Sequence, residues 1–266
     1  MTVTTSRDVA GALSVTVLGC SGTYAAAGNP CSGFLVRGGG TAVLLDCGPG
    51  TLANLQEHVT LDEVDAVVVS HEHPDHWLEI PLLRHAWRYG WGVRREGVPL
   101  FATTGTRRLA TSLTSGDLDD TFDVTEIGDG AVFRVGALSL SCSRTAHTVE
   151  SLAVRVDHAG ASVAYTADTG ADWRIAELGP GLDLVVAEAT FLSADGLTGM
   201  GGVHMTAAEA GGSAAEAEAS ALVLTHVLPG RSWAEAVAEA GAAYGAPVEP
   251  AAPHRTFEVG AGPAPA

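Results

Sequence analysis

Histidine and aspartate side chains concentrate in one short segment of the chain, S-H-E-H-P-D-H at residues 70–76. The segment continues directly from a near-continuous apolar run at residues 66–70, which is typical of a strand covered on both faces. Imidazole nitrogens and carboxylate oxygens are the atoms with which proteins bind zinc and related divalent cations. This spacing therefore predicts a metal site rather than a solvated polar loop, with four ligands: His71, His73, Asp75 and His76.

Three more candidate ligands follow later predicted strands: His147, Asp168 and His226. Each of them alone has an ordinary explanation. A single histidine is commonly a surface or core residue, and A-D-T-G at residues 167–170 is good turn chemistry. Because the carboxyl ends of strands gather at one edge of a sheet, the position that all three share favours metal binding.

The seven ligands divide into two groups around a shared carboxylate. We expect His71, His73 and His147 to hold one cation, and Asp75, His76 and His226 to hold the other. Two metals about 3.5–4 Å apart need a shared ligand, and Asp168 is the candidate that bridges them. A water between the metals would be a hydroxide near neutral pH and would act as the nucleophile, with Asp75 counted among the catalytic residues as well. Zn²⁺ is the expected cation, and Mn²⁺ or Fe²⁺ accept the same ligands.

Strands must deliver these side chains, and the hydrophobic patterns predict where they lie. Within each half of the chain strands come first and helices follow, which predicts an α/β (α+β) protein with two mixed sheets packed face to face and flanked by helices. We expect a single domain over residues 13–259, with flexible tails at 1–12 and 260–266. Strands are predicted at 13–18, 33–37, 41–46, 66–70, 132–135, 138–143, 152–157, 162–166, 184–188 and 221–225, and helices at 52–58, 77–89, 107–113, 172–178, 206–219 and 233–244.

The composition is that of a globular domain and not of a disordered or membrane-spanning chain. Hydrophobic residues make up 46% and charged residues 17% of the 266 residues. No apolar run approaches the roughly 18 residues that span a bilayer, and the first residues carry no secretory signal, so we expect a cytoplasmic protein without a membrane partner. The formal charge of −17 repels long nucleic acids but leaves room for a small anion at a metal centre.

The chain resembles the metallo-β-lactamase superfamily, and within it the branch of ribonuclease Z-like enzymes and cyclic nucleotide phosphodiesterases. The H-x-H-x-D-H motif at 71–76 carries the first resemblance. The second rests on L-D-C-G-P-G-T (45–51), A-H-T-V-E-S (146–151), T-A-D-T-G (166–170), A-E-A-T-F (187–191), H-M-T-A-A-E-A (204–210) and L-T-H (224–226). The resemblance implies a four-layer αββα sandwich and the metal assignment above. It also implies that His204 is a general acid or leaving-group stabiliser, oriented by Glu188. By themselves, His204 could be a residue near a helix cap and Glu188 a carboxylate at a helix start.

Differences between this sequence and the families that it resembles narrow the range of possible substrates. Ribonuclease Z enzymes that process tRNA carry a long arm between the third histidine ligand and the bridging aspartate, whereas Asp168 here follows His147 by only 21 residues. Classical zinc β-lactamases lack the bridging aspartate, and flavodiiron proteins place an acid where His73 stands. We therefore expect a small phosphodiester such as a cyclic nucleotide. The alternatives are an ester, thioester or lactone hydrolase, a ribonuclease Z-like RNA endonuclease, and a non-catalytic metal-binding protein.

A segment rich in Arg and aromatic residues, R-H-A-W-R-Y-G-W-G-V-R-R at 84–95, follows the metal motif. Aromatic faces can stack a base and Arg can pair with a phosphate, which makes Arg88, Trp91 and Arg94 candidate substrate contacts. In the alternative interpretation, Trp87 and Tyr89 pack this helix against the core. The Arg side chains then lie on a solvated face or at the contact of a homodimer.

Overall fold

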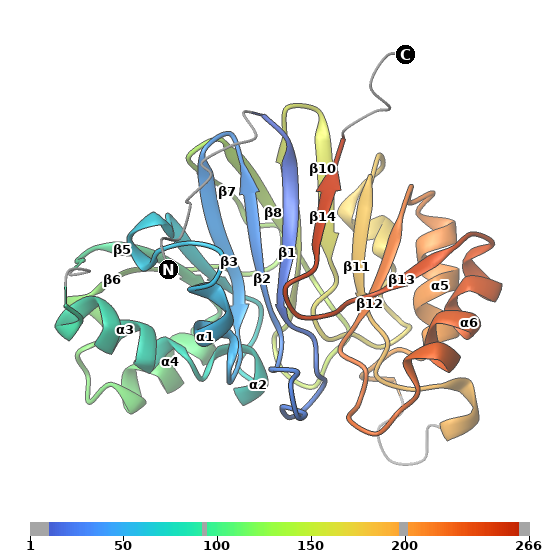
Figure 1. The fold of residues 1–266 in the computed structure, drawn as a ribbon, viewed down its shortest axis with the longest axis horizontal. Helices are drawn as coiled ribbons and strands as arrows, with labels where there is room; N and C mark the ends of the chain where they lie inside the picture. The colour runs from blue at the N-terminus through green and yellow to red at the C-terminus, as the bar shows by residue number, and fades with distance from the viewer. Residues whose placement is uncertain (1–10, 92–94, 197–201, 261–266) are drawn as a thin grey trace.

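The computed structural model describes residues 11–91, 95–196 and 202–260, so nearly all of the two predicted tails falls outside the described residues. Two seven-stranded sheets stand face to face, and helices cover the outer face of each (Figure 1). This is the predicted four-layer αββα arrangement, and the fold prediction is confirmed. Among the described residues, no helix combines the length and hydropathy required to cross a membrane.

The first sheet has the strand order β14-β1-β2-β3-β4-β5-β6. Neighbours from β14 to β3 are antiparallel and neighbours from β3 to β6 are parallel. Its strands are β1 (Leu13–Gly19), β2 (Gly33–Gly38), β3 (Thr41–Cys47), β4 (Ala66–Val69), β5 (Val98–Ala102), β6 (Phe122–Glu126) and β14 (Thr256–Val259). Helices α1 (Thr51–Leu55), α2 (Pro74–Trp77), α3 (Ile80–Tyr89) and α4 (Thr104–Leu113) lie on its outer side, at the left in Figure 1.

The second sheet repeats this plan with the strand order β13-β12-β11-β10-β9-β8-β7. Strands β7 to β10 are antiparallel neighbours, and β10 to β13 are parallel. Its strands are β7 (Val132–Val135), β8 (Leu138–Arg144), β9 (Leu152–His158), β10 (Ala161–Tyr165), β11 (Leu184–Glu188), β12 (Leu222–Thr225) and β13 (Val248–Pro250). Helices α5 (Ala207–Glu216) and α6 (Trp233–Tyr244) cover it at the right in Figure 1. Short 3₁₀ helices occupy Leu61–Glu63, Leu118–Asp120, Ile175–Leu178 and Ser193–Asp195.

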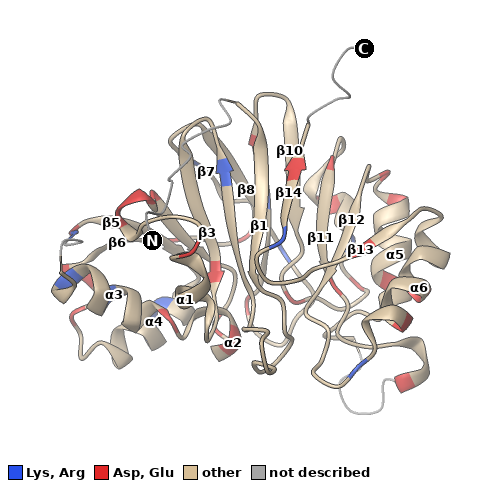
Figure 2. Ribbon diagram, in the orientation of Figure 1, with Lys and Arg blue, Asp and Glu red and all other residues tan. Residues whose placement is uncertain are grey.

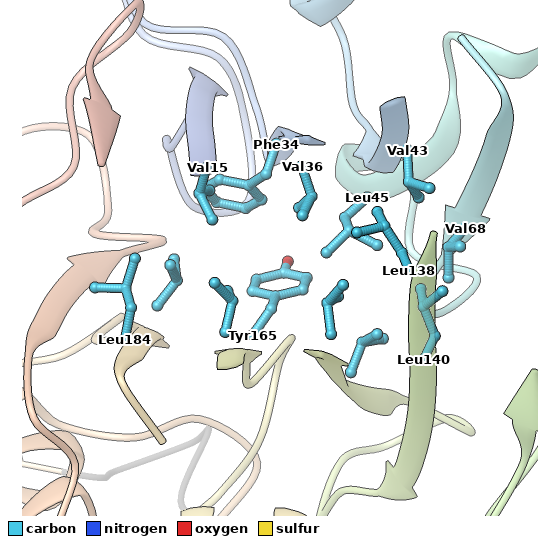
Figure 3. Close-up of a cluster of buried hydrophobic side chains, with 14 of the residues drawn as sticks. Val15, Phe34, Val36, Val43, Leu45, Val68, Leu138, Leu140, Tyr165 and Leu184 are labelled. Atoms are coloured by element: carbon cyan, nitrogen blue, oxygen red, sulfur yellow. The ribbon is translucent and has the colours of Figure 1, made fainter. Parts of the chain in front are cut away.

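The main hydrophobic core lies between the two sheets (Figure 3). Val15, Phe34 and Leu45 reach into it from the first sheet, and Leu138 and Tyr165 reach into it from the second. Each fully buried aliphatic or aromatic side chain of this kind contributes roughly 1.5–3 kcal/mol. Two further cores lie between each sheet and its helices. Together the three cores fix the edge of the sheets at which the predicted ligands emerge.

Local patterns predicted most elements but not all. Strands β5, β6, β13 and β14 were missed, and Pro99 within β5 shows why, because a proline argues against a strand inside a sheet. The predicted helix at 77–89 is wrong as one element, since α2 ends at Trp77 and α3 begins at Ile80. The predicted helix at 172–178 is only a 3₁₀ turn from Ile175.

Candidate metal centre

The fold brings all seven predicted ligands together at the ends of β4, β8, β10 and β12. Asp75 and His76 lie in α2, and the other five lie in the loops that follow these strands. Their nitrogen and oxygen atoms gather in groups in which every ligand atom lies within 4.8 Å of the others. One group consists of His71, His73, His147 and Asp168, another of Asp75, His76 and His226, and a third of Asp168, His204 and His226. The first two groups contain the ligands that the sequence assigns to the two cations, while the third adds His204, which that assignment does not count as a ligand.

Asp168 lies between the two groups and turns one carboxylate oxygen to each. Its Oδ2 is 3.6 Å from Nε2 of His71 and 3.9 Å from Nε2 of His147. Its Oδ1 is 3.3 Å from Nε2 of His76 and 3.4 Å from Nε2 of His226. A carboxylate in this orientation can serve as a ligand to both groups at once.

Several buried polar atoms at this site lack hydrogen-bond partners and are better suited to binding a cation. Within the described part of the chain, Nε2 of His71, Nε2 of His76 and Oδ1 of Asp168 are buried without a hydrogen-bond partner. Each unsatisfied buried group costs about 1–3 kcal/mol, so three at one point require an explanation. A nitrogen and oxygen donor set of this kind suits a divalent cation of the zinc type.

The electrostatics hold two of these ligands in the form that binds cations. Burial and the neighbouring histidines lower the pKa of His71 well below its usual value, which keeps its imidazole neutral. Burial alone would raise the pKa of Asp168, but His226, His76 and His71 lower it well below its usual value. A neutral imidazole beside an ionised carboxylate is the pair that metal binding requires.

A second buried carboxylate, Asp46 at the end of β3, orients two of the ligands. Its Oδ2 accepts hydrogen bonds from Nδ1 of His76 at 2.7 Å and from the hydroxyl of Ser70 at 2.8 Å. The Ser70 hydroxyl in turn lies 3.0 Å from Nδ1 of His71, and the hydroxyl of Tyr165 donates to Asp46 at 2.8 Å. These bonds leave the Nε2 atoms of both histidines facing the site. Sequence reasoning quoted the L-D-C-G-P-G-T motif but missed the role of Asp46.

Backbone strain accompanies the same loops. Asp46, Ala167 and His226 have φ angles of 55°, 51° and 58°, in the left-handed region that most side chains avoid. Such conformations cost about 1–3 kcal/mol each and persist where the surrounding structure imposes them. His226 is a candidate ligand, Ala167 precedes the candidate ligand Asp168, and Asp46 orients His76. The strain therefore lies at the candidate site.

His204 and Glu188 lie beside the candidate metal ligands. Nδ1 of His204 donates to Oε1 of Glu188 at 2.8 Å, and the ring of His204 stacks on that of His226 with 5.5 Å between centroids. The loop that carries His204 ends in a capping box, in which Thr206 and Glu209 start α5. Burial disfavours the charged imidazole, but the Glu188 carboxylate prevails and raises the pKa of His204 to about 9.

Two of the three candidate substrate residues, Arg88 and Trp91, lie away from this cluster. Arg88 forms ion pairs with Glu96 at 3.1 Å and Asp120 at 3.5 Å, and Trp91 is fully exposed. Arg94 lies outside the described residues. The ten residues of α3 extend about 15 Å, which separates Arg88 and Trp91 from α2. Trp87 packs inside the core, as the alternative interpretation expects, but that interpretation is wrong for Tyr89, which is 67% exposed.

Two packed sheets, outer helices and a histidine–aspartate cluster define a hydrolase of the metallo-β-lactamase fold. A family described as the Beta-lactamase superfamily domain matches residues 41–227. This chain belongs to the β-lactamase superfamily.

Three relatives place the chain within that family. Protein Rv1339 of Mycobacterium tuberculosis is 36% identical over 254 residues, which are 92% of this chain and 92% of its own. The protein of Bacillus subtilis named "Probable metallo-hydrolase YhfI" is 31% identical over 217 residues, 81% of this chain and 87% of its own. The crystal structure of YhfI superposes with a TM-score of 0.84 at 27% identity, over 93% of this chain and 99% of that one. Ribonuclease Z of Halobacterium salinarum is 26% identical over 269 residues, 81% of this chain and 87% of its own.

Proposed function

We propose that this protein is a binuclear metal-dependent hydrolase that cleaves a small phosphodiester such as a cyclic nucleotide. The observation that carries the proposal is the position of Asp168, whose two oxygens face two separate groups of ligands. The alignment with a ribonuclease Z favours a phosphodiester, and the name of YhfI favours a metal-dependent hydrolase.

Each of two cations would have its own set of ligands. His71, His73 and His147 would hold one, Asp75, His76 and His226 would hold the other, and Asp168 would contribute to both. When bound, two divalent cations, with Zn²⁺ expected first, supply Lewis acidity to phosphoryl oxygens and lower the pKa of a coordinated water.

His204 supplies the proton for the leaving oxygen in this proposal. Its Nδ1 is occupied by the hydrogen bond to Glu188, so the proton available for transfer is on Nε2. In the metal-free protein a pKa of about 9 keeps the imidazole protonated at neutral pH, as a general acid requires. Glu188 is completely buried and accepts a second hydrogen bond from the backbone N–H of Thr169 at 2.8 Å, so it holds the ring in one orientation.

A small substrate fits this chain better than a long RNA. Acidic residues lie on both helical layers, and basic residues are few and scattered over the described elements (Figure 2). The 21-residue step from His147 to Asp168 contains only β9, β10 and their turns. A polyanion would meet a repulsive surface, whereas a small anion is drawn by the cations alone.

The decisive experiment measures metal content and substrate turnover together. The purified protein is assayed for bound metal and for hydrolysis of 3′,5′-cyclic AMP, 2′,3′-cyclic AMP and bis-p-nitrophenyl phosphate, beside a His73→Ala variant. We expect about two metals per chain and turnover of a cyclic nucleotide that the variant loses. Two metals with turnover of lactones or thioesters and of no diester would overturn the proposed substrate class. Cleavage of tRNA precursors alone would favour the endonuclease, and metal binding without any turnover would favour a non-catalytic protein.

A homodimer of this protein is a separate prediction. Sedimentation velocity at several concentrations checks it, and a monomer at every concentration contradicts it.

A further inference from the structure

Thr190 lies next to the candidate metal centre, and it is neither a candidate metal ligand nor the proposed proton donor. The residue is buried, with 1% of its surface exposed, and it follows β11 two positions after Glu188. Its hydroxyl oxygen lies 2.6 Å from Oε2 of Glu188 and 2.8 Å from Nδ1 of His226. Thr190 therefore touches both the carboxylate that holds His204 and one of the candidate ligands.

The direction of these hydrogen bonds follows from proton counting. A hydroxyl carries one proton, and an ionised carboxylate can only accept. The Thr190 proton therefore points to Glu188, and the hydroxyl oxygen must accept a proton from Nδ1 of His226. His204 donates to Glu188 at 2.8 Å and lies farther from the Thr190 hydroxyl, at 3.3 Å, so it does not compete for that position.

This arrangement determines which nitrogen of His226 faces the cations. With the proton on Nδ1, Nε2 of His226 carries a lone pair, and it lies 3.2 Å from Oδ2 of Asp75 and 3.4 Å from Oδ1 of Asp168. Three electron-rich atoms then face one another, which is favourable only with a cation among them. A hydrogen bond of this kind to the outer nitrogen of a ligand histidine fixes the tautomer and the ring orientation.

We propose that Thr190 is a positioning residue that couples the metal centre to the proton donor, because one hydroxyl sets the tautomer of His226 and anchors the carboxylate of Glu188. The inference rests on the proposed metal-dependent hydrolase and adds a residue to its machinery. It makes Glu188 a shared anchor, which holds His204 directly and His226 through Thr190.

Two variants of Thr190 separate the hydroxyl from the shape of the side chain. Thr190→Val keeps the volume and removes the hydroxyl, while Thr190→Ser keeps the hydroxyl. We expect Thr190→Val to weaken Zn²⁺ binding by about 10–100-fold in competition with a chelator, as loss of a ligand-orienting partner does. Thr190→Ser should return close to the wild-type affinity. Thr114→Val is the matched control, because Thr114 is also buried and its hydroxyl donates to Ala110 O at 3.0 Å, at the C-terminal end of α4.

A spectroscopic readout tests the tautomer without any substrate. In ¹⁵N-labelled, zinc-loaded protein the Nδ1–H proton of His226 should be protected from exchange, and Thr190→Val should lose this protection. The coupling itself is tested by combining Thr190→Val with Glu188→Gln, and we expect the double variant to bind zinc no more weakly than Thr190→Val alone.

Wild-type zinc affinity in Thr190→Val, or a serine variant as weak as the valine variant, overturns the inference. The zinc affinity is measured without any substrate. Failure of the inference about Thr190 is therefore distinguishable from failure of the proposed activity. A protein that cleaves no diester can still show the affinity loss, and an active diesterase can lack it.

Discussion

Nδ1 of His76 donates a hydrogen bond to Oδ2 of Asp46 at 2.7 Å, and both side chains are almost completely buried. The contact turns the opposite nitrogen of His76 to Asp168, 3.3 Å away. Burial disfavours the charged form of His76, but Asp168, Asp46 and Asp75 raise the pKa of this imidazole well above its usual value. In the metal-free protein a proton therefore occupies a place for which a cation competes.

The first prediction concerns this contact. Asp46→Asn keeps a side chain that tolerates the left-handed backbone at φ 55°, and it removes the charge that holds His76. We expect the affinity for Zn²⁺ to fall by about 10–100-fold while the fold is retained. Chelator competition and circular dichroism measure the two effects. Unchanged zinc affinity would show that Asp46 does not orient the ligand.

Asp168→Asn tests the shared carboxylate. The amide lacks the negative charge and presents only one oxygen, so it cannot serve both ligand groups. We expect the zinc content to fall below two per chain and phosphodiester turnover to drop by about 10²–10³-fold, as loss of several kcal/mol of charge stabilisation implies. Elemental analysis and single-substrate kinetics provide the measurements. A variant that keeps two zinc ions per chain contradicts the bridging assignment.

His204→Gln separates the proton donor from the metal site. If His204 protonates the leaving oxygen, kcat for a cyclic nucleotide should fall by about 10²–10⁴-fold with unchanged zinc content. The loss should be much smaller for bis-p-nitrophenyl phosphate, because p-nitrophenolate leaves without a proton. Equal losses on both substrates would count against proton donation, and loss of zinc would make His204 structural.

The ion pair of His204 and Glu188 predicts how the stability of the metal-free protein depends on pH. The pKa of His204 rises from 6.5 to about 9 on folding, so protonated His204 stabilises the folded state. This contribution is fully present below pH 6.5 and is lost as the pH rises through 9; it amounts to about 3 kcal/mol at most. Thermal unfolding of the wild type and His204→Gln in chelator should therefore differ most at pH 6 and converge above pH 9. A constant difference across this range would refute the prediction.

Gly48 marks a close approach that the site requires. A Cβ at this position would lie 1.9 Å from the backbone oxygen of Asp75 and 2.7 Å from Cβ of Cys31. We expect Gly48→Ala to destabilise the fold by about 1–3 kcal/mol and to weaken zinc binding by displacing Asp75. Gly212→Ala is the control, because Gly212 lies in α5 with nothing within 4 Å, and alanine there should stabilise by about 0.5–1 kcal/mol. Denaturant unfolding checks both variants, and equal stabilities would contradict the packing argument.

The sequence by itself determined the fold class and the residues proposed for the metal site. Apolar runs such as β4 and β11 are local signals, and their bounds agree with the patterns to within a residue or so. His71, His147 and Asp168 each come two or three residues after a strand, so the chain order alone places them near strand ends.

Only the tertiary structure decided which partners orient these ligands and where the ends of the sheets lie. Tyr165 reaches Asp46 across 119 positions of sequence, and β14 pairs with β1 so that Val259 lies opposite Leu13. The same packing carries Arg88 to an ion pair with Asp120 at the far end of α3. Hydrogen bonds and ion pairs of this kind leave no periodic pattern in the sequence, because they form only after the hydrophobic cores have fixed the sheets against each other.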